Sequence, residues 1–306
     1  MHTFRRTFSG GADLEAMSAL ARAYPAEHLH ILDLPYRFSS WALDDAANAG
    51  LWFTPEGRLV AWAVLQAPFW AVDHARQPDA HEDLGREVWS WADARARVLA
   101  GTPGGHPAWF VSVFSGQQDL IRELEEAGFA CQSEVGEDSW SKVWMRQPAK
   151  LPAECSAPAG FAIRPLAGEG EVAAYVELQR EVFGTDNMTV GWRSRTLRQP
   201  EYIPDLDLVV EAPDGRLAAF CIAWLDRRHP EGPAGQIEPM GVREEMRHLG
   251  LGRALLTEAL ERLIQRGAKQ IYVETDSFRN AALDLYEAVG FRVIRDVLVF
   301  RKDYEE

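Results

Sequence analysis

Apolar and polar residues recur along this chain with two different periods, and the period predicts which segments are helices and which are strands. In the segment 253–264, leucine and alanine recur three and four residues apart, the spacing of an amphipathic helix. The segment 271–275 is rich in β-branched and aromatic residues and predicts a strand. Residues 280–291 return to helical spacing. This succession indicates a mixed α/β (α+β) fold.

The same succession of elements occurs twice. A short strand and a helical segment begin each copy, at 4–24 and 161–183, and two strands joined by a Pro-acidic-Gly turn follow. Three landmarks recur: Phe4 and Phe161, Gly57 and Gly215, and Phe129 and Phe291. Their separations of 157, 158 and 162 residues argue for a tandem duplication. A Pro- and Ala-rich linker at 147–160 separates the copies, so we expect two domains, 1–150 and 151–306.

In the second copy, a turn with two glycines precedes the helix at 253–264. The first backbone N–H groups of a helix lack internal partners and lie at its positive end, and glycines let an anion approach them closely. The sequence therefore predicts a binding site for a diphosphate. Its residues are Arg247, His248, Leu249, Gly250, Leu251, Gly252 and Arg253.

The first copy differs at this turn. With a separation of 162 residues, Gly85, Val88 and Ser90 correspond to Arg247, Gly250 and Gly252. This segment has no glycine pair, and its carboxylates would repel a diphosphate. They belong to Asp79, Glu82, Asp83 and Glu87. We therefore expect domain 1–150 to keep the fold and to lack the cofactor motif.

The order of strand, Arg-x-x-Gly-x-Gly turn, helix, strand and Ala-x-x-x-Tyr286-x-x-x-Gly-Phe resembles the GCN5-related N-acetyltransferase (GNAT) superfamily. The resemblance is most specific over 235–293 and extends loosely over 160–303. It implies two tandem GNAT-like domains, each with a mixed, mostly antiparallel sheet flanked by helices. In the C-terminal copy it also implies that the fourth and fifth strands splay apart, with acetyl-CoA bound between them.

The resemblance also assigns roles to residues outside the turn. The open backbone of Met240, Gly241 and Val242 would pair with the pantetheine arm, and Tyr286 would protonate the departing thiolate. Seven residues before this tyrosine, where the family often has asparagine, stands Arg279, and Asn280 follows it. Either side chain could contact coenzyme A.

A general base is also needed, because an alkyl amine with a pKa of about 10.4 is almost fully protonated at neutral pH. Glu238 is the first candidate, since it lies on the strand that should splay beside the acyl group. Glu274 and Asp276, at the end of the next strand, are the second. Pro239 follows Glu238 and cannot donate to a strand ladder, so we expect a bulge there.

Composition narrows the range of partners. A formal net charge of −14 opposes nucleic acid and favours cationic partners. The longest apolar run is shorter than the roughly 20 residues of a membrane span, and the first residues lack the apolar core of a signal peptide. Three cysteines without a Cys-x-x-Cys pair indicate neither a zinc site nor a disulfide framework. We expect a cytoplasmic protein without a metal.

These observations predict an N-acetyltransferase that moves an acetyl group from acetyl-CoA to the primary amine of a small molecule by direct transfer. The two-copy layout is similar to the mycothiol synthase family, in which the C-terminal domain is active. Gln236 stands where that family carries a glutamate, so the acceptor stays open. The alternatives are a non-enzymatic CoA-binding sensor or docking module, and a protein N-terminal or lysine acetyltransferase. We expect a monomer or a weak homodimer.

Overall fold

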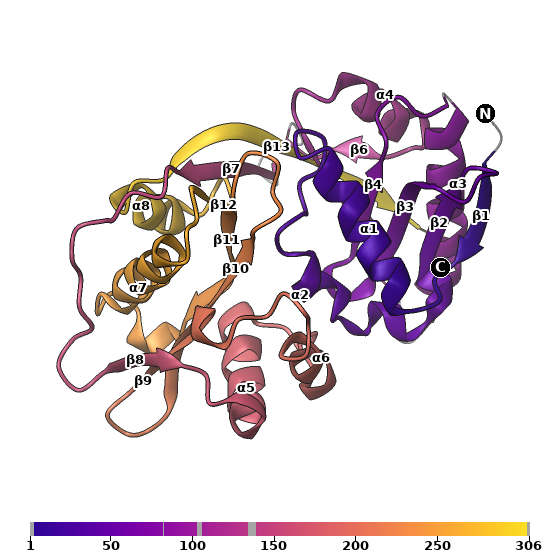
Figure 1. Cartoon of the computed structure of the whole chain (residues 1–306). Helices are drawn as coiled ribbons and strands as arrows, with labels where there is room; N and C mark the ends of the chain where they lie inside the picture. The colour runs from indigo at the N-terminus through magenta and orange to yellow at the C-terminus, as the bar shows by residue number, and fades with distance from the viewer. Residues whose placement is uncertain (1–2, 82, 103–105, 134–138, 305–306) are drawn as a thin grey trace. The chain divides into compact units, whose positions relative to one another are not determined.

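The computed structural model describes residues 3–81, 83–102, 106–133 and 139–304. Glu82, one of the acidic residues named above, lies outside them. The chain divides into two compact units (Figure 1). Unit 1 comprises Met1–Val143 with Arg295–Glu306, and unit 2 comprises Trp144–Ile294.

Unit 1 is a mixed sheet flanked by helices. Its strands are, in spatial order, β1 (Phe4–Thr7), β2 (Ala49–Phe53), β3 (Leu59–Gln66), β4 (Ala71–Arg76), β5 (Ala108–Phe114) and β13 (Arg292–Asp303), with β6 (Ala130–Cys131) also on β13. Among the strand pairs described in this unit, β4 and β5 are parallel and the others are antiparallel. Its helices are α1 (Gly11–Ala23), α2 (Leu34–Phe38), α3 (Asp83–Ala100) and α4 (Gln118–Glu126).

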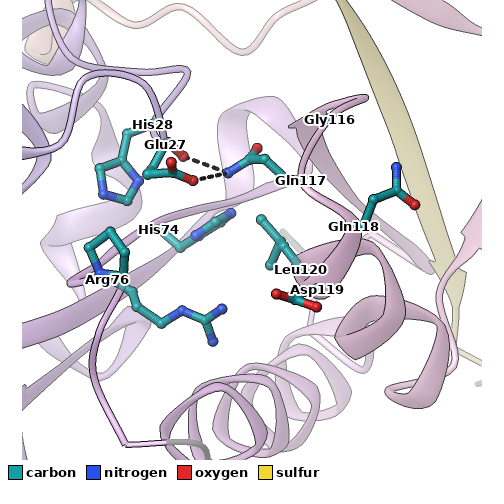
Figure 2. A pocket seen from close by; sticks show the side chains of 10 residues that line it. Glu27, His28, His74, Arg76, Gly116, Gln117, Gln118, Asp119 and Leu120 are labelled. Atoms are coloured by element: carbon teal, nitrogen blue, oxygen red, sulfur yellow. Dashed lines mark hydrogen bonds between the residues drawn. The ribbon is translucent and has the colours of Figure 1, made fainter.

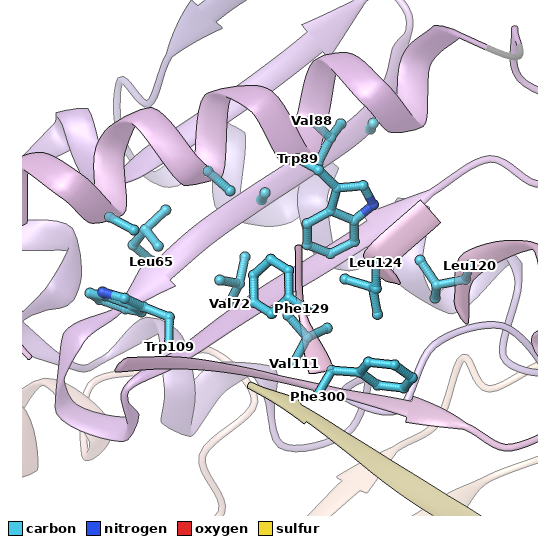
Figure 3. Close-up of a cluster of buried hydrophobic side chains, with 14 of the residues drawn as sticks. Leu65, Val72, Val88, Trp89, Trp109, Val111, Leu120, Leu124, Phe129 and Phe300 are labelled. Atoms are coloured by element: carbon cyan, nitrogen blue, oxygen red, sulfur yellow. The ribbon is translucent and has the colours of Figure 1, made fainter. Parts of the chain in front are cut away.

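The core of unit 1 lies between this sheet and helices α3 and α4 (Figure 3). Trp89 of α3 packs edge-to-face on Phe129, with their ring centroids 6.1 Å apart. Phe300 of β13 belongs to the same cluster and is 1% exposed. The last strand of the chain therefore supplies part of the core of unit 1.

Unit 2 repeats the arrangement. Its strands are, in spatial order, β7 (Ser141–Gln147), β12 (Gln270–Asp276), β11 (Ala234–Val242), β10 (Leu217–Asp226), β9 (Asp207–Glu211) and β8 (Ala162–Pro165). The pairs β8–β9, β9–β10 and β10–β11 are antiparallel, and β11–β12 is parallel. Its helices are α5 (Val172–Phe183), α6 (Val190–Thr196), α7 (Leu251–Gln265) and α8 (Asn280–Ala288). The predicted mixed, mostly antiparallel sheet is confirmed.

The two units share local detail as well as element order. Arg6 on β1 pairs with Asp13 on α1 at 2.5 Å, and Arg164 on β8 pairs with Glu171, just before α5, at 2.6 Å. Both pairs are seven residues apart and tie the first strand to the helix that follows it.

The last strand of each sequence half is grouped with the other unit. Residues 144–147 of β7 belong to unit 2, and residues 295–303 of β13 belong to unit 1. Relative to the halves 1–150 and 151–306, the units exchange their terminal strands. Within the described residues, no helix is long and apolar enough to cross a membrane.

Candidate active site

Strands β11 and β12 part in the middle of unit 2. They pair in parallel at only three positions, the last of which joins Gln236 to Tyr272. Beyond it β11 continues to Val242 and β12 to Asp276, with no further pairing between them among the described residues. The splayed strands that the sequence predicted are confirmed, and the gap opens next to Glu238.

A β-bulge lies at the start of this gap. The register of β10 against β11 shifts between Cys221 and Ala223, so that Glu238 and Pro239 lie opposite a single residue. The peptide between Glu238 and Pro239 is cis. The indole N–H of Trp224 donates a hydrogen bond of 2.7 Å to the carbonyl oxygen of Glu238, which satisfies a polar group that the bulge removes from the ladder. The bulge predicted from Pro239 is confirmed.

After the bulge, the two faces of β11 have different neighbours. A Cβ atom on Gly241 would lie 2.5 Å from Val182 of α5 and 2.8 Å from Phe220, so this position has no room for a side chain. Met240 and Val242 alternate with Gly241 and point to the opposite face, toward helix α7.

The glycine turn, the end of β11 and helix α8 meet at Gly252. A Cβ atom there would lie 3.4 Å from Val242, 3.5 Å from Leu285 of α8 and 3.8 Å from Met240. Residues that the sequence separates by up to 45 positions, from Met240 to Leu285, therefore surround one point. This point is the first turn of α7.

The N-terminus of α7 has no protein group that satisfies it. The structure describes this whole turn, and in it Gly250 is the N-cap residue, with φ of 82° and no side-chain cap, and the first helical turn has no acidic residue. The first backbone hydrogen bond of the helix runs from Ala254 N to Gly250 O at 3.0 Å. The N–H groups of Leu251, Gly252 and Arg253 lie before it and are available to an anion.

The segment before the helix is exposed. Arg247, His248, Leu249 and Gly250 all lie at the surface, and His248 has φ of 63°. The guanidinium of Arg247 donates from Nε to the carbonyl oxygen of Val242 at 3.3 Å, which ties the turn to the end of β11. The predicted diphosphate residues are thus gathered on one accessible turn.

Tyr286 lies on α8, half-buried, with its ring 5.7 Å from that of Phe291. Burial raises the pKa of Tyr286, and the nearby carboxylate of Glu238 and thiol of Cys221 raise it further. The phenol therefore stays protonated at neutral pH. Glu238 and Tyr286, 48 positions apart in the sequence, lie close enough for one to act on the other's pKa.

Cys221 was not among the residues selected from the sequence. It is fully buried on β10 opposite Met240. Burial raises the pKa of its thiol, and the charges of Asp207 and Glu238 raise it further, so this group is a neutral thiol. Its only sequence signal is its position on a strand that pairs with the splayed one.

Arg279 and Asn280 mark the start of α8. Arg279 forms an ion pair of 2.8 Å with Asp276 at the end of β12, and Asn280 is exposed. This pair engages Asp276, one of the two second-choice bases, in holding the start of the helix. Arg279 also lies near enough to Tyr286 to oppose part of the rise in its pKa.

A buried ion pair joins helix α6 to strand β9 of the same sheet. Arg193 of α6 and Asp207 of β9 are fully buried and form an ion pair, and the Arg193 guanidinium stacks 3.8 Å above the ring of Tyr175. The hydroxyl of Tyr202 donates to Asp207 at 2.7 Å. Arg193 is therefore a structural residue of the unit.

In unit 1, charged side chains occupy the position that corresponds to this site. A Cβ atom on Gly85, in the first turn of α3, would lie 2.3 Å from Nη1 of Arg76 and 2.3 Å from Oε2 of Glu123. These residues come from the end of β4 and from α4, as Val242 and Leu285 come from β11 and α8. The structure therefore corrects the sequence correspondence: Gly85, and not Ser90, is the equivalent of Gly252.

Comparison with protein families finds a match in the second half of the chain. Residues 172–291 match the model described as the acetyltransferase (GNAT) family. Mycothiol acetyltransferase of Kineococcus radiotolerans is 37% identical over 145 residues, which are 45% of each chain. The enzyme of the same name from Thermomonospora curvata is 31% identical over 153 residues, 48% of this chain and 50% of the relative. The chain thus spans about half the length of the curated relatives it matches.

Solved structures match over the whole chain. A tandem GNAT protein from the clavulanic acid biosynthesis pathway has a TM-score of 0.65 at 14% identity and covers 100% of this chain and 99% of its own. A GCN5-related N-acetyltransferase from Sphaerobacter thermophilus has a TM-score of 0.65 at 20% identity, covering 98% and 95%. At these identities the likeness shows the fold alone, which this chain shares with both structures over nearly its whole length.

Proposed function

We propose that this chain transfers an acetyl group from acetyl-CoA to the primary amine of a small molecule in unit 2, since residues 172–291 match the acetyltransferase (GNAT) family and the whole chain resembles a tandem GNAT structure. The observation that carries the proposal is the convergence at Gly252. An unsatisfied helix N-terminus, the splayed end of β11 and the helix that bears Tyr286 surround one point.

The residues present fit an acyl-CoA. The N–H groups from Leu249 to Arg253 would hold the diphosphate, with Arg247 and Arg253 adding charge from the surface. Each such term contributes only about 0.3–1 kcal/mol, so several must act together. The backbone of Met240, Gly241 and Val242 would pair with the pantetheine amides as an added strand does. Arg279 and Asn280 would border the same site.

Bound acetyl-CoA supplies an activated acyl group, and two side chains of this chain would move the protons. Glu238 would accept the proton that the amine must lose as its nitrogen bonds to the carbonyl carbon. Tyr286 would donate a proton to the sulfur as the carbon–sulfur bond breaks. The phenol of Tyr286 carries the proton it must deliver, since its pKa lies above neutral pH. Much of the remaining rate acceleration would come from holding the amine in line with the thioester.

Two observations support a small amine as the acceptor. The relatives that match over about half of this chain are named mycothiol acetyltransferase, and the net charge of −14 attracts cations. Gln236, at the position where that family carries a glutamate, is 1% exposed. Two fused copies already join two GNAT-like domains in one chain, as a homodimer would, and this favours a monomer.

The test is a calorimetric titration of the full chain with acetyl-CoA, repeated on Gly252→Asp and Gly252→Ala. A carboxylate at the start of α7 stabilises the helix by about 0.3–1 kcal/mol, yet it would repel the diphosphate. Because the alanine variant adds the Cβ without the charge, the difference between the two isolates the electrostatic effect. We expect one site per chain, lost in Gly252→Asp and weakened less in Gly252→Ala.

Transfer is then assayed as acetyl-CoA consumption with small primary amines and with peptides. Binding without consumption would favour the sensor, and consumption with peptides alone would favour a protein acetyltransferase. Absence of binding, or binding that ignores Gly252, would remove the proposed donor site.

A further inference from the structure

A cavity of about 310 Å³ lies in unit 1 where strands β4 and β5 part (Figure 2). The two strands pair at a single position, Ala71 with Phe110, and then diverge. His74 and Arg76 line the cavity from β4, the segment 116–120 from the start of α4, and Glu27 and His28 from the segment after α1. This is the place in unit 1 that corresponds to the gap beside Glu238 in unit 2.

His28 is the least satisfied group of the cavity wall. It is 5% exposed, and neither ring nitrogen has a hydrogen-bond partner among the described residues. A buried polar atom left unpaired costs about 1–3 kcal/mol, so a molecule that supplies the missing hydrogen bond, water included, is stabilised here. Figure 2 shows the imidazoles of His28 and His74 on the same side of the cavity, above Arg76.

Both imidazoles are neutral at neutral pH. Burial lowers the pKa of His28 to about 4, and the charge of Arg76 lowers it too. The backbone of Arg76 lies near the imidazole and offsets part of this lowering, although the two do not form a hydrogen bond. Burial lowers the pKa of His74 to about 3, and His28 and Arg76 add to the effect. A neutral imidazole presents one N–H donor and one acceptor nitrogen. The cavity wall therefore offers donors and acceptors in equal number at these two residues.

The charged groups of the cavity argue against an ionic ligand. The guanidinium of Arg76 is held by Glu123 at 2.7 Å and 3.0 Å. Burial, which keeps both imidazoles neutral, and the charge of Arg76 beside them disfavour an ammonium at the two histidines. A phosphate would meet the carboxylates of Glu27 and Asp119, which also line the cavity. The remaining chemistry is that of a neutral polar molecule.

We propose that this cavity binds a neutral, hydroxyl-rich small molecule of monosaccharide size. A hydroxyl group both accepts and donates, so it matches the N–H or the acceptor nitrogen of a neutral imidazole and the carboxylate of Glu27. Pro78 and Leu120 supply apolar surface for the C–H face of a ring. Small-molecule pockets range from about 300 to 1,000 Å³, so this cavity accommodates one ring and excludes coenzyme A. The proposal is independent of acetyl transfer in unit 2.

The experiment is a titration of the full chain, carrying ¹³C-labelled histidine, with D-glucose, D-mannose and D-galactose, followed by the histidine ring resonances. We expect at least one sugar to shift the resonances of His28 and His74 in a saturable way. The variant His28→Ala should bind about tenfold more weakly, equivalent to about 1.4 kcal/mol. His81→Ala is the matched control, since that histidine lies outside the cavity wall.

A second variant guards against loss of folding in His28→Ala. Gly116 lines the cavity and a Cβ atom there meets no described atom within 4 Å, so Gly116→Phe adds a ring to the cavity wall without removing a core contact. Its histidine resonances should remain those of a folded protein, and they should no longer shift when sugar is added. Absence of a saturable shift with all three sugars, or a shift that survives both variants, would overturn the proposal. Inorganic phosphate and methylammonium are tested alongside, and a saturable shift with either would overturn the neutral class.

Discussion

Protonation of His28 should make unit 1 acid-sensitive well above the pH at which carboxylates titrate. The unfolded chain has a histidine pKa of about 6.5, whereas burial lowers the pKa of His28 in the folded state to about 4. Below pH 6.5 the unfolded state therefore binds a proton that the folded state refuses. Stability from this group is complete above the unfolded pKa and is lost as the pH falls through the window from 6.5 to 4.

The magnitude follows from the two pKa values. Between pH 7 and pH 5, the free energy of unfolding should fall by about 2 kcal/mol because of His28 alone. His74 should act in the same direction, since its pKa is also lowered. His30 should act weakly in the opposite direction, because Asp33 and Asp73 help to raise its pKa. The difference between the wild type and His28→Leu reports the contribution of His28 together with its effect on the pKa of His74.

The assay is urea unfolding at pH 7 and pH 5, followed by tryptophan fluorescence. Eight of the eleven tryptophans, all but Trp144, Trp192 and Trp224, lie in unit 1, so the signal reports mainly on that unit. We expect the wild type to lose about 2 kcal/mol more than His28→Leu over this interval. Equal losses in the two proteins would refute the reasoning, because they would mean that His28 titrates alike in the folded and unfolded states.

Three further substitutions test the site and the core. Tyr286→Phe should lower kcat by about 10²- to 10⁴-fold with little change in acetyl-CoA affinity, and an unchanged kcat would remove Tyr286 as the acid. Glu238→Gln should lower turnover at neutral pH and recover it at higher pH, and an unaltered pH–rate profile would exclude Glu238 as the base. Phe300→Ala should cost about 3–5 kcal/mol in the unfolding of unit 1. Arg301→Ala, at an exposed position of the same strand and in the same unit, should cost little, and equal losses would refute the role of Phe300 in the core.

Local patterns predicted the parts of unit 2 that short segments determine. The helix expected at 253–264 is α7, and its buried residues Leu255, Leu256, Ala259, Leu260 and Leu263 are those that the periodicity selects. Pro239 predicted the bulge because a residue without an N–H cannot continue a ladder. These features depend on neighbours in sequence, which is why one sequence sufficed.

Features that depend on distant partners were not predictable in the same way. The pattern at the end of the chain indicates a strand but not that Phe300 lies in the core of unit 1. Cys221 lies near Tyr286 only because β10 pairs with the splayed strand. His28 and His74 are 46 positions apart and meet only through the packing of β4 against the segment after α1. Periodicity carries no information about such pairs.

The two copies differ in one contact that explains how a duplicated unit could lose its donor site. Around Gly252 the nearest side chains are apolar and leave at least 3.4 Å, whereas over Gly85 the ion pair of Arg76 and Glu123 comes within 2.3 Å of a Cβ position. An acyl-CoA entering unit 1 would have to displace this pair and place its diphosphate against the carboxylate of Glu123. We propose that unit 1 therefore binds no acyl-CoA, and that β4, whose register against β3 is unbroken, presents His74 and Arg76 to the cavity instead.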